Sequence, residues 1–220
     1  MATIDRTDPD QLAAARALVV QSLTEAHATE EALVTTLRAH IAMTPAGGYR
    51  NLLERHLGET RQHARAIERR LDELGAGRGL LASGLDLAQT FVGQVVALSK
   101  GPVDLLRGRS GEEKLLKNAK DECATEALEI ATYDALHALA EAVGDDKTAQ
   151  LALRHRGQEE RMLEELRALI GSLAHATALA QATGDPTYDP SAASSPSSST
   201  ARPRPKKSHT STTLPSGSET

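Results

Sequence analysis

The stretch that decides the fold is ECATEALEIATY, residues 122–133. Its acidic and aromatic residues recur at gaps of 4, 3 and 4: Glu122, Glu126, Glu129 and Tyr133. On an α-helix this spacing places all four side chains on one face, which continues with Leu136, Ala140 and Val143. We therefore expect carboxylates on a face that points into the core. An ionised carboxylate is costly there unless a partner or a metal ion compensates it.

The composition predicts an all-α protein with an aliphatic core. Aromatic residues make up only 2 % of the chain, so Leu, Ala, Val and Ile have to fill the interior. The abundant Ala, Leu, Glu and Arg favour helices, and no window alternates as a strand would. The mild net charge of −5 argues against nucleic acid as a main partner. The single cysteine, Cys123, excludes an intrachain disulfide, and we interpret it as a small core residue.

Start and stop signals divide the chain into helices. Four long helices are expected, over residues 8–43, 49–74, 110–143 and 147–183. The pair Asp8-Pro9 is a typical helix start, and Ser110 with Glu113 has the spacing of a capping box. A Thr-Pro-Ala-Gly-Gly break follows the first helix, and glycines end the second. The pattern predicts a four-helix bundle over residues 1–184.

A glycine-rich connector, residues 76–109, separates the second and third helices. It contains an apolar segment that we expect to form two helical pieces broken at Gly101-Pro102. So long a connector fits a crossover that returns along a bundle. Its apolar face would pack on the bundle or on a dimer partner; membrane association through the flanking cations is the alternative.

Residues 185–220 are rich in Ser, Pro and Thr and too poor in apolar residues to fold, so we expect a disordered tail. It carries a small basic cluster: Arg202, Arg204, Lys206 and Lys207. The tail either solubilises and links the domain or docks an unknown partner. The N-terminus lacks the apolar stretch of a signal peptide, and no run is long enough to span a membrane. A cytoplasmic location is the expectation.

Each long helix offers an inward glutamate near its middle. The candidates are Glu30, Glu59, Glu126 with Glu129, and Glu159. In an antiparallel bundle the mid-points of long helices meet in one cross-section. Di-iron and di-manganese bundles use this arrangement, because anionic oxygen ligands suit these metals and carboxylates bridge two ions. The spacing therefore indicates a dinuclear iron or manganese site.

Four pieces of the sequence resemble the bacterial ferritin-like stress proteins of the YciE/YciF type. They are EEALVTTL around Glu30, HLGET at residues 56–60, EALEIATYDALHALAEAVGD from Glu126, and EERMLEEL from Glu159. The pair Glu126-x-x-Glu129 is also similar to rubrerythrin. The resemblance covers most of residues 10–170. It implies a ferritin-like four-helix fold, often dimeric, with a dinuclear metal site and a link to stress responses.

Two positions depart from the Glu-x-x-His pattern of ferritin-like metal sites. The second helix has Gln62 and the fourth has Met162 where a histidine is expected. His56 and His63 flank Glu59 and are the next candidate ligands, and His155 lies one turn before Glu159. These histidines either supply the missing nitrogen ligands or are hydrogen-bonded core residues, in which case carboxylates alone bind the metal.

Two hypotheses about function follow. In the first, the protein is a di-iron oxidoreductase, peroxidase-like or ferroxidase-like, that handles peroxide, oxygen or iron. In the second, it is a non-catalytic helical stress or scaffold protein that acts by dimerisation or by docking partners. Gln62 and Met162, which stand where histidines are expected, favour this second hypothesis. Tyr133 is either a packed aromatic or a redox or hydrogen-bonding partner of the metals.

Overall fold

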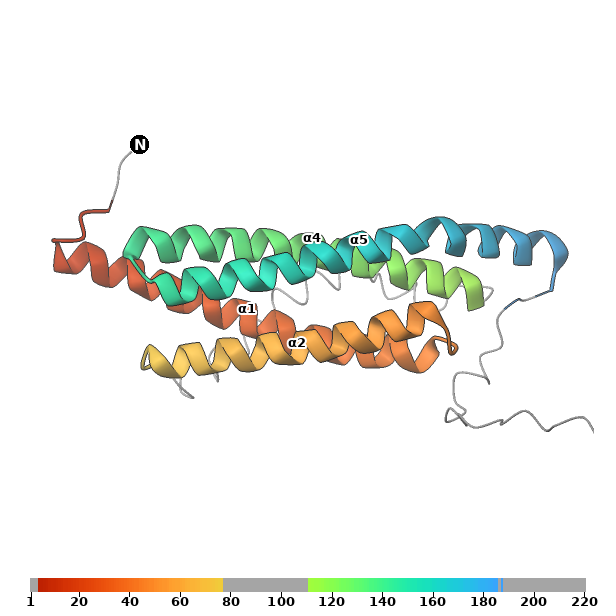
Figure 1. Cartoon of the computed structure of the whole chain (residues 1–220), viewed down its shortest axis with the longest axis horizontal. Coiled ribbons are helices and arrows are strands. Elements are labelled where there is room, and N and C mark those ends of the chain that lie inside the picture. Colours follow the sequence, from red (N-terminus) through yellow and green to blue (C-terminus); the bar gives the residue numbers. More distant parts are fainter. Residues whose placement is uncertain (1–3, 77–110, 186, 188–220) are drawn as a thin grey trace, which may run out of the picture.

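A computed structural model describes residues 4–76, 111–185 and 187 of the chain. These residues form four long α-helices and no strand (Figure 1). The helices are α1 (Pro9–Met43), α2 (Gly48–Glu73), α4 (Gly111–Val143) and α5 (Asp146–Thr183). The prediction of an all-α bundle is confirmed, and each described helix end lies close to its predicted position.

Local side-chain chemistry explains where these helices begin and end. The Asp8 carboxylate accepts hydrogen bonds from the first backbone N–H groups of α1, and Pro9 occupies the first turn, as predicted. Asp145 caps α5 in the same way. Gly184 ends α5 at a φ of 73°, in the left-handed region that glycine adopts without strain. The expected cap at Ser110 lies outside the described residues.

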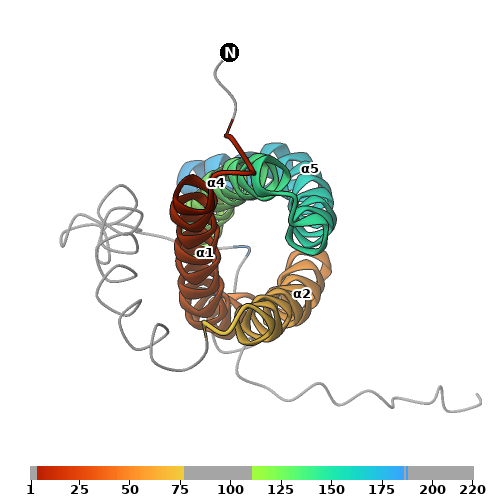
Figure 2. The same ribbon diagram turned by 90° about the vertical axis from the view of Figure 1, so that its left-hand side faces the viewer.

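The four helices surround a common axis, as the end-on view in Figure 2 shows. α1 packs along α2, α4 packs along α5, and α1 also packs on α4. α2 ends at one end of the bundle and α4 begins at the other (Figure 1), as a crossover connection requires. The predicted crossover pieces and the predicted disordered tail themselves lie outside the described residues, apart from the first positions of the tail.

The interior has two apolar ends and a polar middle. One apolar cluster includes Leu23, Ile67, Leu71, Leu136 and Leu151. The other includes Leu37, Leu53, Leu115, Met162 and Leu166. On every helix the buried glutamate and histidine candidates predicted from the sequence lie between these two clusters, whereas the buried His40 and Glu112 lie outside this region. Apolar packing on both sides therefore keeps the polar middle away from water. None of the described helices is both long and apolar enough to cross a membrane.

Candidate metal centre

Six of the seven predicted ligands lie in this polar middle, each 2 % exposed or less. They are Glu30, His56, His63, Glu126, Glu129 and Glu159. They come from all four helices, because each helix turns its apolar stripe inward and these residues interrupt that stripe. The structure therefore brings together residues as far apart as 30 and 159 in the sequence.

Glu59 is the exception, and its prediction as an inward residue needs correction. It is only half-buried, whereas the following Thr60 is 1 % exposed. At about 100° per residue, Glu59 lies about 60° to one side of His56, and Thr60 lies about 40° to the other. The buried stripe of α2 runs on the Thr60 side, towards Ala64 and Ile67. Glu59 therefore lies outside both groups of potential metal ligands described below.

The buried donors form two groups. Within each group, the potential ligand atoms all lie within 4.8 Å of one another. The first group consists of Glu30, His63 and His155, and the second of His56, Glu126, Glu129 and Glu159. The sequence placed His155 near Glu159 as a possible source of a missing nitrogen ligand, but the leading set of candidate ligands did not include it. Its signal was present, since His155 precedes Glu159 by four residues and shares its helix face.

Glu159 connects the two groups. Its Oε1 lies 2.8 Å from Nδ1 of His63, and its Oε2 lies 3.8 Å from Nε2 of His56. The same His56 nitrogen lies 3.3 Å from Glu126 Oε1. The Glu159 carboxylate thus faces His63 of the first group with one oxygen and His56 of the second group with the other.

Tyr133 and the imidazoles form the wall of the first group. The Tyr133 hydroxyl donates a hydrogen bond to Glu30 Oε1. The rings of His63 and His155 stack with their centroids 4.0 Å apart, and Tyr133 packs edge-on to His155 at 5.1 Å. Tyr133 is therefore both a packed aromatic and a hydrogen-bonding partner of a candidate ligand.

A further buried pair, His40 and Glu122, lies beyond the second group. Nδ1 of His40 contacts Glu122 Oε1, and both residues are at most 5 % exposed. Glu122 was predicted to share the inward face of its helix, which is confirmed. His40 had no comparable signal, because Glu122, the partner of its ring nitrogen, lies 82 residues away in the sequence.

Burial and mutual repulsion raise the pKa of two carboxyl groups well above the usual range. For Glu126 the repulsion comes from Glu129 and Glu159, and for Glu129 it comes from Glu30 and Glu159. Burial alone would lower the pKa of His63, but the adjacent Glu159 and Glu30 carboxylates raise it to about 10. The centre therefore contains more carboxyl groups than its own cations balance.

His155 has the opposite behaviour. Burial, together with the positive charge of His63, lowers the pKa of His155 to about 2. Its ring is therefore neutral at physiological pH, and its Nδ1 has no hydrogen-bond partner among the described residues. A neutral imidazole with an unpartnered nitrogen is the form of histidine that binds metal ions.

The unpartnered atoms test whether these residues fit a metal. The following buried atoms have no hydrogen-bond partner within the described parts of the chain: Glu30 Oε2, both ring nitrogens of His56, both carboxylate oxygens of Glu126 and of Glu129, and Nδ1 of His155. Folded proteins leave few buried polar atoms unpaired. Carboxylate oxygens and imidazole nitrogens are also the donors that iron and manganese accept in proteins. The residues therefore fit a metal centre.

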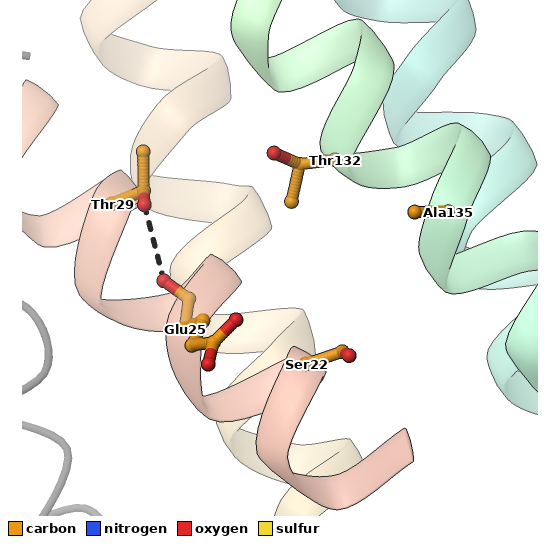
Figure 3. A pocket seen from close by; sticks show the side chains of 5 residues that line it. All are labelled: Ser22, Glu25, Thr29, Thr132 and Ala135. Carbon is orange, nitrogen blue, oxygen red and sulfur yellow. Dashed lines mark hydrogen bonds between the residues drawn. The ribbon is translucent and has the colours of Figure 1, made fainter. Parts of the chain in front are cut away.

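A separate surface pocket does not share this chemistry. It has a volume of about 150 Å³ and lies between α1 and α4, lined by Ser22, Glu25, Thr29, Thr132 and Ala135 (Figure 3). Glu25 is its only ionisable lining residue, and Thr29 donates its hydroxyl hydrogen to the Glu25 backbone carbonyl. One carboxylate is too few for a stable metal site, so the buried centre is the better candidate.

Four long helices around a buried carboxylate and histidine centre define a ferritin-like bundle. The chain belongs to the family described as a domain of unknown function, DUF892, whose model matches residues 14–179. No curated protein matches the chain at a significant level.

Solved structures with similar folds include the following three. The first is a protein from Xanthomonas campestris pv. campestris, with a TM-score of 0.59 and 21 % identity, covering 76 % of this chain and 98 % of that one. The E. coli stress protein YciF has a TM-score of 0.55 and 19 % identity, over 73 % and 97 % of the two chains. YcfI from Rhodopseudomonas palustris has a TM-score of 0.53 and 18 % identity, over 70 % and 92 %. At these identities the likeness concerns the fold alone, and it agrees with the resemblance found in the sequence.

Proposed function

We propose that this protein binds a dinuclear iron or manganese centre in its core and uses it, under stress, to react with peroxide or oxygen or to oxidise iron. The observation that carries the proposal is the position of Glu159, whose two oxygens face two adjoining groups of unpartnered donors. The stress context is supported by the similarity to a protein described as a stress protein.

The chain supplies distinct donors for each of two ions. Glu30, His63 and His155 would hold one ion, and His56, Glu126 and Glu129 would hold the other. A bound pair of such ions supplies redox chemistry that the side chains alone lack. The apolar clusters on both sides exclude water, and the Tyr133 hydroxyl holds Glu30 in place.

The histidines compensate for the two departures from the usual ferritin-like pattern. Gln62 is exposed and Met162 is packed in an apolar cluster, so neither supplies a ligand. His56 and His63 come instead from the neighbouring turns of α2, and His155 comes from the preceding turn of α5. Nitrogen ligands are thus present, in positions different from those of the usual motif.

Metal analysis tests the proposal directly. The protein should be produced in iron-rich medium and its iron, manganese and zinc measured by mass spectrometry, followed by anaerobic titration of the metal-free protein with Fe²⁺. We expect about two ions per chain, as in other dinuclear bundles, and a clear reduction for Glu126→Ala. A wild-type content well below one ion per chain, unchanged by Glu126→Ala, would overturn the proposal.

The second candidate is a non-catalytic scaffold that acts by dimerisation or by docking partners. The exposed Gln62 and the apolar surroundings of Met162 favour it, because both helices lack the usual histidine. Under this hypothesis the buried glutamates bind nothing, and their replacement by leucine stabilises the protein whether or not metal is added.

A further inference from the structure

His63 presents its two ring nitrogens to different surroundings. Nδ1 lies 3.2 Å from Glu30 Oε1 and 2.8 Å from Glu159 Oε1, inside the first ligand group. Nδ1 is therefore close to one oxygen of each of the two carboxylates. Nε2 points out of the group and lies 3.1 Å from the side-chain oxygen of Gln158. Gln158 therefore contacts His63 on the side away from the ligands.

The Gln158 contact decides which nitrogen of His63 is available. An amide oxygen only accepts hydrogen bonds, so the imidazole donates its Nε2 hydrogen to it. In the metal-free protein Nδ1 also carries a hydrogen, since the pKa of His63 is about 10; once this hydrogen is lost, Nδ1 has a lone pair that faces Glu30 and Glu159. A cation bound by these carboxylates takes that lone pair, and any hydrogen on Nδ1 leaves to solvent. A histidine ligand is commonly held in this way through its second nitrogen.

Aromatic neighbours restrict the rotation of the same ring. His155 stacks on one face of His63, with an angle of 21° between the planes. Tyr133 approaches it edge-on, with ring centroids 6.3 Å apart. These contacts hold the plane of the ring, but they do not distinguish one nitrogen from the other. Only a polar contact such as that of Gln158 does so.

We propose that Gln158 is a positioning residue for metal binding: by accepting the Nε2 hydrogen of His63, it orients Nδ1 into the group formed by Glu30, His63 and His155. The inference rests on the proposed metal centre and adds a residue that is not a ligand. Gln158 directly precedes Glu159 on α5, so one turn of helix supplies both the carboxylate that lies near both groups and the residue that orients a histidine on α2.

The test compares Gln158→Leu, Gln158→Glu and the wild-type chain. Gln150→Leu is the matched control, because Gln150 lies on an exposed face of the same helix. Co²⁺ affinity is measured by competition with a coloured chelator, and the His63 tautomer is read by ¹⁵N NMR of histidine-labelled protein loaded with diamagnetic Zn²⁺, because the metal-free ring carries both hydrogens. Gln158→Leu should weaken binding at one of the two positions by about 10–100-fold and weaken the Nε2–H signal of His63. Gln158→Glu should keep both, since a carboxylate accepts the same hydrogen.

The outcomes distinguish the role of Gln158 from the existence of the metal centre. If the wild-type chain binds Co²⁺ and Gln158→Leu binds it equally well with the same tautomer, the role of Gln158 is refuted while the metal centre stands. If the wild-type chain binds no metal, both inferences fail together. A loss of affinity in Gln150→Leu as large as in Gln158→Leu would also overturn the proposal, because the effect would then not depend on His63.

Discussion

Replacement of Glu129 by leucine should raise the stability of the metal-free protein and abolish its stabilisation by metal. Glu129 is 2 % exposed, and both of its carboxylate oxygens lack a hydrogen-bond partner among the described residues. A buried unpartnered polar group costs about 1–3 kcal/mol, which a leucine of similar size does not incur. For a domain of this size 1 kcal/mol corresponds to about 2–4 °C in melting temperature. We therefore expect metal-free Glu129→Leu to melt about 2–12 °C above the wild type.

Bound metal should reverse the order of the two melting temperatures, so that the wild type becomes more stable than Glu129→Leu. A ligand present at 100 times its Kd stabilises the folded state by about 2.7 kcal/mol, or about 5–10 °C here. The wild-type chain should gain this on addition of Co²⁺ or anaerobic Fe²⁺, and Glu129→Leu should gain far less, because a donor of the second ligand group is missing.

The assay is thermal unfolding by circular dichroism, with chelator and with saturating metal. Glu164→Leu, on the exposed face of α5, is the control and should respond to metal as the wild type does. Two results would refute the reasoning. One is a metal-free Glu129→Leu that melts well below the wild type, which means that the carboxylate stabilises the apoprotein. The other is an equal metal-induced shift in both proteins.

Three further predictions follow from the structure. Glu59→Gln should leave the metal content unchanged and Glu126→Gln should reduce it, as measured by mass spectrometry; equal loss in both would contradict the position found for Glu59. Partial burial raises the pKa of Asp145, but the hydrogen bonds from Arg70 and Thr148 and the charge of Arg70 together outweigh this and lower it overall. The charged Asp145 carboxylate therefore stabilises the fold at pH values above its ordinary pKa of 3.8, and this stabilisation is lost as the pH falls through the lowered pKa. Asp145→Ala should reduce the free energy of unfolding, measured in urea, by about 1–2 kcal/mol near pH 7 and by less near pH 3. Deletion of residues 188–220 should leave the melting temperature and the metal content unchanged; if the tail docks a partner, it should change the location of a fluorescent fusion in cells.

Helix periodicity predicted most of the site, because burial within a helix follows from local spacing. The gaps between Glu122, Glu126, Glu129 and Tyr133 placed all four on one face, and all four are buried in the structure. Glu30 and Glu159 were found in the same way, as charges within apolar stripes. Capping residues and glycines likewise predicted the described helix ends, since these are local effects.

The same reasoning failed at Glu59 because periodicity defines a buried face only to about one residue, or about 100° of rotation. On α2 both Glu59 and Thr60 lie near the apolar stripe of the sequence, and only the packing of the whole helix turns Thr60 inward. A small rotation decides between a buried carboxylate and a half-exposed one.

The amino-acid sequence by itself determined the helices, the described helix ends, the face that each helix buries and the family to which the chain belongs. Tertiary structure alone decided which donors share a group: that Glu159 lies between His56 and His63, and that Gln158 meets the outer nitrogen of His63. The physical reason is that spacing along a chain sets the direction of a side chain around its own helix. The rotation and the axial position of one helix against another depend on the packing of all the helices at once.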